Sequence, residues 1–201
     1  MVRVLMVSHA CTVAAYRRKL EELARIGGPE LELTLVVPPR WGSARFEPGN
    51  ERGYAMRTVS PVLNGRHHLH WYPALRRIMA ELKPDLLHLD EEPYDLVTFH
   101  GLLTAQRTGA RTVFFTWQNL FRRFPPPFGL WERYVLQHAH GAIAGTEGAA
   151  SVLRRKGYGG PLFCIPQFGV DPEVYSPEPR ADKETARPFR IGFAGRLVPE
   201  K

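Results

Sequence analysis

Short apolar runs alternate with longer segments of helical periodicity along the first 165 residues, and this alternation constrains the fold more than any other feature. Such strands, separated by helices, lie parallel in one sheet with helices on both of its faces. We therefore expect an α/β fold with a doubly wound parallel sheet. The predicted strands are Val2–Val7, Leu31–Val37, Tyr54–Val62, Asp85–Leu89, Arg111–Thr116, Ala142–Ala144 and Leu162–Ile165. The predicted helices are Val13–Ile26, His70–Leu82, Tyr94–Arg107, Phe128–His138 and Glu147–Lys156.

The domain organisation follows from where this alternation stops. Residues 1–165 form the predicted first domain, and residues 166–188, rich in proline and charge, form a predicted linker. An apolar strand begins again at Phe189 and leads into a glycine and two basic residues. We expect residues 189–201 to be the first strand and phosphate-binding loop of a second domain that is truncated here.

The formal net charge of +7 favours acidic partners, such as phosphate-bearing substrates or an anionic membrane surface. The chain has no zinc-finger or RNA-recognition signature, so no nucleic acid is expected. Paired basic residues such as Arg17-Arg18 are interpreted as solvated helix faces, except for Arg122-Arg123. Two cysteines make no disulfide framework, and the amino-terminal apolar run is too short for a signal peptide. A cytoplasmic protein is expected, in peripheral contact with the inner face of a membrane.

Four segments, in this order along the chain, resemble a known family of enzymes. They are Pro84-Asp-Leu-Leu-His-Leu89, Ala142-Ile-Ala-Gly-Thr-Glu147, the linker run Ile165-Pro-Gln-Phe-Gly-Val-Asp-Pro-Glu-Val-Tyr-Ser-Pro177, and Gly195-Arg-Leu-Val-Pro-Glu-Lys201. Together they are similar to the retaining glycosyltransferases of family 4, which have the GT-B fold. The resemblance implies that this chain is the Rossmann-like N-terminal half of a GT-B architecture. It also implies that the acceptor binds to this half and the nucleotide sugar mainly to the other.

The resemblance assigns the donor diphosphate to Gly195, Arg196 and Lys201. Gly195 lets the backbone approach the ligand, and the two cations neutralise the diphosphate as the sugar leaves. Arg196 and Lys201 are thus the expected catalytic residues, and no metal or other cofactor is expected. The family's E-x7-E element lies beyond Lys201, so this part of the protein alone should not catalyse the reaction.

Ligands of parallel α/β sheets bind beyond the carboxyl ends of the strands, and this rule selects the expected acceptor-binding residues. They are His9, Glu91, Glu92, Gln118 and Asn119. His9 follows the first strand and could instead cap the next helix. The two glutamates could instead complement a helix dipole. Gln118 stands where many family members have a histidine, and the first loop lacks the family's Gly-Gly pair. The aromatic residues of the loop from Trp117 to Phe128 either stack on a sugar or pack locally.

His67, His68 and His70 invite a metal hypothesis, but they have no acidic residue at a ligand spacing. We expect them to lie in a surface loop. Thr146 is the predicted N-cap of the helix that follows it.

The expected function is transfer of a sugar from a nucleotide-sugar donor to an acceptor hydroxyl, with retention, in polysaccharide, glycolipid or other glycoconjugate synthesis. The expected acceptor is a glycan or a lipid-linked molecule. Two alternatives stay open: a nucleotide-sugar epimerase of the GT-B fold, and a non-catalytic module that binds an acidic glycan or nucleic acid.

Overall fold

The computed structural model describes residues 1–49, 52–176 and 191–192. Met1–Gly169 forms one compact unit, and the chain from Val170 onward is divided from it. The predictions for most of the linker, and for the strand and loop that carry Gly195, Arg196 and Lys201, lie outside the described residues.

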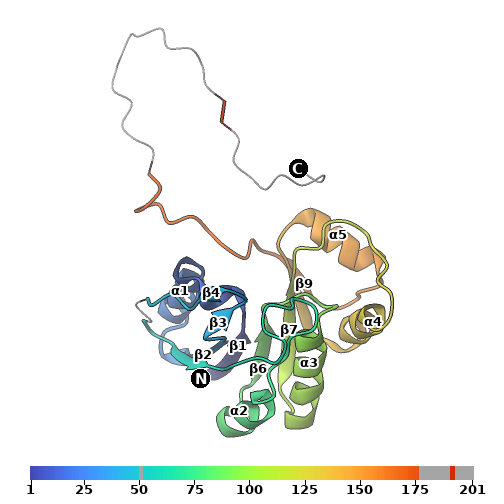
Figure 1. Ribbon diagram of the computed structural model, residues 1–201, viewed down its shortest axis with the longest axis horizontal. Helices are drawn as coiled ribbons and strands as arrows, with labels where there is room; N and C mark the ends of the chain where they lie inside the picture. Colours follow the sequence, from blue (N-terminus) through green and yellow to red (C-terminus); the bar gives the residue numbers. More distant parts are fainter. Residues whose placement is uncertain (50–51, 177–190, 193–201) are drawn as a thin grey trace. The chain divides into compact units, whose positions relative to one another are not determined.

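Seven parallel strands form one sheet in the order β5-β2-β1-β6-β7-β8-β9 (Figure 1). The strands are β1 (Val2–Val7), β2 (Leu31–Val37), β5 (Ala55–Thr58), β6 (Leu86–Leu89), β7 (Arg111–Thr116), β8 (Gly141–Ala144) and β9 (Leu162–Cys164). A two-stranded antiparallel hairpin, β3 (Arg40–Trp41) with β4 (Ala44–Arg45), follows β2. The chain therefore winds away from β1 in one direction, then crosses back to β6 and continues in the other. This arrangement confirms the predicted doubly wound, Rossmann-like sheet.

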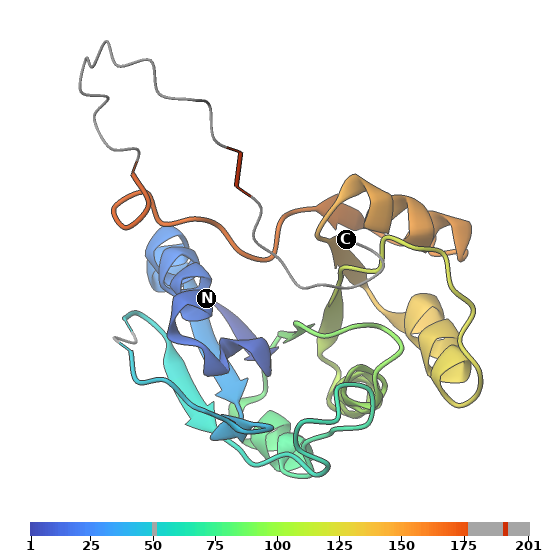
Figure 2. The same ribbon diagram turned by 45° about the horizontal axis from the view of Figure 1, so that its top comes forward.

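The helices are α1 (Arg18–Gly27), α2 (Leu75–Leu82), α3 (Leu96–Thr108), α4 (Phe128–His138) and α5 (Glu147–Arg155). Short 3-10 turns cover Ala10–Thr12, Ala14–Arg17 and Gly28–Glu30. The strands run between α1 on one side and α2 and α3 on the other (Figures 1 and 2). Thr146 caps α5 as predicted, because its hydroxyl accepts a hydrogen bond from the amide of Ala149 at 3.1 Å.

The helix predicted to start at Val13 starts at Arg18, since Val13 is extended and Ala14–Arg17 forms a 3-10 turn. Leu20 and Ala24 are buried as predicted, but Tyr16 and Leu23 are 37% and 43% exposed. Arg17 was expected on a solvated face, and that expectation is wrong. Its guanidinium is buried and donates hydrogen bonds to the backbone carbonyls of nearby loops, at 2.8 Å to that of Cys11.

The helix predicted over His70–Leu82 starts only at Leu75. Tyr72 precedes Pro73, and a residue before proline disfavours the helical conformation. The chain around His70 and Tyr72 therefore enters the core as a loop, and both side chains are fully buried. This loop places His70 at the site described below.

The two faces of the sheet are covered unequally. One face packs against residues of α2, α3, α4 and α5 in a single large apolar cluster. The other face packs against Leu20 of α1 in a smaller cluster that reaches β1, β2 and, through Met56, β5. Phe163 of β9 lies in register with Ile143 of β8 and is 56% exposed. Within the described part of the chain, α1 is the only helix that contributes to the smaller cluster.

Within the same described residues, no helix combines the length and apolar composition needed to cross a bilayer.

Candidate functional site

The carboxyl ends of β1 and β6 meet at the point where the winding of the sheet reverses. In doubly wound folds this point opens a crevice where ligands bind. Ser8 and His9 follow β1, and the acidic run Asp90-Glu91-Glu92 follows β6. The β1–β6 pairing, with Val7 opposite Leu89, brings these two loops side by side.

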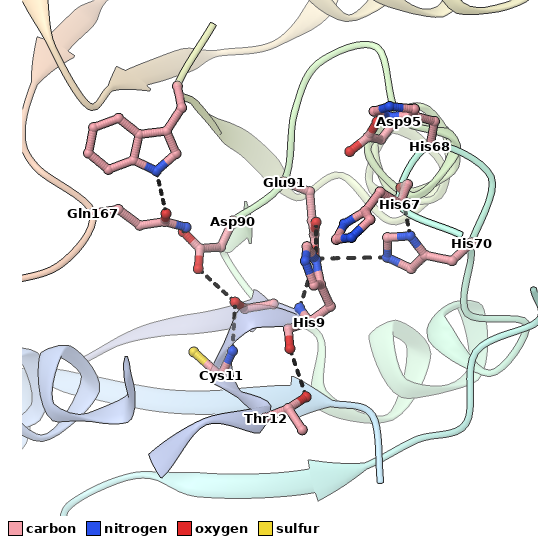
Figure 3. Close-up of polar contacts among 12 residues, drawn as sticks. His9, Cys11, Thr12, His67, His68, His70, Asp90, Glu91, Asp95 and Gln167 are labelled. Atoms are coloured by element: carbon pink, nitrogen blue, oxygen red, sulfur yellow. Dashed lines mark hydrogen bonds and ion pairs between the residues drawn. The ribbon is translucent and has the colours of Figure 1, made fainter. Parts of the chain in front are cut away.

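Asp90 is the anchor of this region. Its carboxylate is buried and accepts hydrogen bonds from Ser8 Oγ at 2.7 Å, Lys19 Nζ at 2.6 Å and Gln167 Nε2 at 2.8 Å. Burial alone would raise the pKa of Asp90, but the Lys19 ammonium and the hydrogen bonds outweigh it and lower the pKa. Gln167 in turn accepts from Trp117 Nε1 at 2.6 Å (Figure 3). Asp90 therefore joins β1, α1, the β7 loop and the segment after β9.

Glu91 holds His9 at the carboxyl end of β1. The Glu91 carboxylate lies 2.6 Å from His9 Nδ1 and also accepts from the backbone amide of His9 at 2.8 Å. Since a carboxylate only accepts, Nδ1 donates, and Nε2 remains for another group. Burial alone would lower the pKa of His9, but the charge and hydrogen bond of Glu91 outweigh it and raise the pKa. The indole of Trp41 packs over the imidazole, with ring centroids 4.2 Å apart.

His70 departs from the sequence prediction. His67 and His68 are exposed, as expected of a surface loop, but His70 is fully buried and its Nε2 lies 3.8 Å from Glu91 Oε1. His68 bonds instead to Asp95 Oδ1 at 2.7 Å. The acidic partner that the sequence seemed to lack is Glu91, which is far from the histidines in the chain and adjacent in space.

Glu92 borders a cavity of about 310 Å³. Its carboxylate accepts from Thr116 Oγ1 at 2.5 Å and from the amide of Trp117 at 2.8 Å. Burial raises the pKa of Glu92 to about 7, so this group exchanges protons near neutral pH. Gln118 and Asn119 also line the cavity, although Gln118 Nε2 donates back to the carbonyl of Leu120 at 2.6 Å. The remaining lining residues are His68, Tyr94, Trp117, Leu120, Arg122 and Phe124.

A larger cavity of about 700 Å³ adjoins this one and shares Arg122 and Phe124 with it. Its walls combine phenylalanine rings with several cations, including Arg123, Arg133 and Lys156. Lys156 pairs with Glu132 at 2.5 Å. The walls suit an amphipathic ligand that carries negative charge.

The five acceptor-binding residues expected from the sequence therefore fall into two groups along one edge of the sheet. His9 and Glu91 form one, and Glu92, Gln118 and Asn119 form the other; their role in acceptor binding stays a prediction. The sequence prediction missed Asp90, Lys19, Gln167 and His70. The strand-end rule that selected Glu91 covers Asp90 equally, whereas no sequence signal connects Lys19, Gln167 or His70 to this edge.

The fold and the site define a doubly wound α/β domain with a cluster of polar side chains at the reversal point of its sheet. Residues 11–166 match the family model of the glycosyl transferase 4-like domain, and the chain belongs to this family. It corresponds to an N-terminal domain of the GT-B fold. Among curated protein sequences, none matches the chain significantly.

Solved structures of the same fold share little sequence with this chain. A sucrose-phosphate synthase from Thermosynechococcus elongatus has a TM-score of 0.56 at 11% identity, over 83% of this chain and 48% of its own. A UDP-N-acetylglucosamine 2-epimerase has a TM-score of 0.54 at 15% identity, over 81% and 47%. The S. aureus MnaA–UDP co-structure has a TM-score of 0.50 at 20% identity, over 79% and 42%. The chain thus spans less than half the length of these proteins.

Proposed function

We propose that this chain is the acceptor-binding half of a retaining glycosyltransferase that moves a sugar from a nucleotide sugar to an acceptor hydroxyl. Membership of the glycosyl transferase 4-like family supports the reaction class. The UDP of the MnaA co-structure supports a nucleotide as part of the donor. In this proposal Gly195, Arg196 and Lys201 bind the diphosphate, and the last two stabilise its charge as the glycosidic bond breaks.

The pairing of His9 with Glu91 is the observation that carries the acceptor site. The carboxylate fixes the imidazole at the carboxyl end of β1 and leaves Nε2 to form a hydrogen bond with a hydroxyl. Glu92, Gln118 and Asn119 border the neighbouring cavity and offer further partners for sugar hydroxyls. The proposed acceptor is a precursor of a polysaccharide, glycolipid or other glycoconjugate.

The test uses the full-length protein and a panel of nucleotide sugars in a thermal-shift assay. We expect one donor to raise the unfolding temperature, and Arg196→Ala and Lys201→Ala each to abolish that rise. Arg77→Ala, at an exposed position of α2, is the matched control and should leave the rise unchanged. Turnover with a suitable acceptor should then give free nucleotide and a product with the anomeric configuration of the donor. If no nucleotide sugar binds, the proposal fails and a non-catalytic binding module is favoured.

A second candidate, nucleotide-sugar epimerisation, is favoured by one observation. The Glu92 carboxyl, with its pKa of about 7, can both accept and donate a proton at neutral pH, as an epimerase requires. Product analysis separates the two reactions, because an epimerase returns an isomerised donor without an acceptor and a transferase releases nucleotide only with one.

A cytoplasmic location and peripheral contact with an anionic membrane complete the proposal. The cations around the larger cavity support such contact. Sedimentation with anionic vesicles at low salt should carry the protein down, and no sedimentation would remove the membrane from the proposal.

A further inference from the structure

Three side chains from distant parts of the sequence converge at the carboxyl ends of β1 and β6. His9 follows β1, His70 lies in the loop before α2, and Glu91 follows β6 (Figure 3). The side chains of His70 and Glu91 are 0% and 1% exposed, and that of His9 is 19% exposed. One ligand atom of each lies within 4.8 Å of the other two.

The hydrogen bonds of His70 determine which of its nitrogens has a free lone pair. Nδ1 lies 2.9 Å from the backbone carbonyl of His67, and a carbonyl only accepts, so Nδ1 carries the proton. Nε2 then presents a lone pair. It is buried and has no hydrogen-bond partner within the described residues.

The unpartnered nitrogen of His70 faces a carboxylate. Glu91 Oε1 is 3.8 Å away, which is too far for a hydrogen bond. Two electron-rich atoms thus face each other in a buried place, and no group of the described residues donates a hydrogen bond to the nitrogen. Such an arrangement is unfavourable unless a cation or a bridging donor occupies the gap.

We propose that His9, His70 and Glu91 bind a divalent transition-metal ion of the zinc class. Two imidazole nitrogens and one carboxylate oxygen are a donor set that zinc accepts. In a tetrahedral site with bonds of about 2.1 Å, ligand atoms lie about 3.4 Å apart. The Glu91–His9 contact of 2.6 Å would open slightly and the Glu91–His70 distance of 3.8 Å would close slightly.

The groups around the three proposed ligands hold them in place, as the outer shell of a metal site does. The carbonyl of His67 orients His70, and the backbone amide of His9 fixes the Glu91 carboxylate at 2.8 Å. Trp41 packs over His9, and the imidazole of His67 meets it edge-on at 5.1 Å. These rings limit the access of water and strengthen the electrostatic attraction.

Three protein ligands leave a fourth coordination position open. A water molecule would complete the coordination of the ion there.

The test measures metal binding by the full-length protein after treatment with a chelator. Calorimetry measures the binding of Zn²⁺, and the absorption spectrum reports the geometry of bound Co²⁺. We expect one ion per chain with a tetrahedral Co²⁺ spectrum. His9→Ala, His70→Ala and Glu91→Gln should each weaken Zn²⁺ binding at least tenfold. His68→Ala is the matched control, because this histidine of the same loop bonds to Asp95 instead and should not affect binding.

Thermal unfolding with and without Zn²⁺ keeps the test informative for destabilised variants. The wild type should gain thermal stability from Zn²⁺, and the three ligand variants should lose that gain. His9→Ala serves if His70→Ala does not fold, since His9 is partly exposed. Absence of stoichiometric binding, or equal binding by all variants, would overturn the proposal. No nucleotide sugar is present, so this result is independent of the donor test.

Discussion

Removing the carboxylate of Asp90 should destabilise the domain more than removing any exposed carboxylate. Asp90→Ala deletes the acceptor of three hydrogen bonds, those from Ser8, Lys19 and Gln167. The Lys19 ammonium, with its side chain only 19% exposed, would lose its ion-pair partner in a place that water reaches poorly.

The magnitude follows from the geometry. Breaking a buried ion pair by removing one partner costs roughly 3–5 kcal/mol, and the partial exposure of Lys19 favours the lower end, about 3 kcal/mol. For a domain of this size each kcal/mol lowers the unfolding temperature by about 2–4 °C. We therefore expect a decrease of about 6–12 °C.

Asp85→Ala is the matched control at the opposite end of β6. Asp85 pairs with Arg3 at 3.5 Å and accepts from its backbone amide at 2.8 Å, but its side chain is 50% exposed, so the loss should be much smaller than for Asp90→Ala. The assay is thermal or urea unfolding of both variants with the wild type. Equal losses in the two variants would refute the reasoning that Asp90 anchors the site.

The pH dependence gives the Asp90 prediction a second check. The pKa of Asp90 is lowered in the folded state from its ordinary value of 3.8. Its contribution is therefore present above pH 3.8 and is lost as the pH falls through the folded pKa. The difference in stability between wild type and Asp90→Asn should be constant near neutrality and shrink below about pH 4.

Three further predictions concern other residues of the same edge. Glu92→Gln should become more stable relative to the wild type as the pH rises from 4.5 to about 7, because burial raises the pKa of Glu92 and ionisation disfavours the folded state. Unfolding at several pH values checks this, and the same pH dependence of stability in both proteins would contradict it. Thr146→Ala should cost about 1 kcal/mol in urea unfolding by removing the α5 cap, whereas Ser151→Ala, at an exposed position of the same helix, should not destabilise. Gly145→Ala places a methyl group against the indole of Trp117 and should cost about 1–3 kcal/mol; an unchanged unfolding midpoint would show that the indole moves freely.

The local pattern of apolar residues was sufficient to predict the sheet. Strands β1, β2 and β7 and helix α4 have the predicted bounds, because their apolar runs are long and have clear ends. The errors fall where tertiary contacts override local preference. Arg17 lies on a polar stretch of sequence, yet its buried guanidinium is satisfied by carbonyl groups of two loops. The late start of α2 depends on Pro73 and on the burial of Tyr72 and His70.

The site was predictable only as far as strand ends could be placed. The position after β6 selected Glu91 and Glu92, and the position after β1 selected His9, each without knowledge of what the side chain contacts. The pairing of His9 with Glu91 depends on the register of β1 with β6, which no local pattern specifies. His70 arrives from an irregular loop, and its partner lies 21 positions further along the chain. Such contacts arise only when the whole sheet is assembled.

The uneven covering of the sheet has a consequence for how the molecule behaves in solution. Beyond β7, the face shared with α1 leaves apolar side chains such as Phe163 in contact with water within the described structure. Each square ångström of such surface costs about 25 cal/mol, and salting-out ions increase that cost. Sulfate should therefore promote self-association through this part of the sheet, and Phe163→Lys should suppress it.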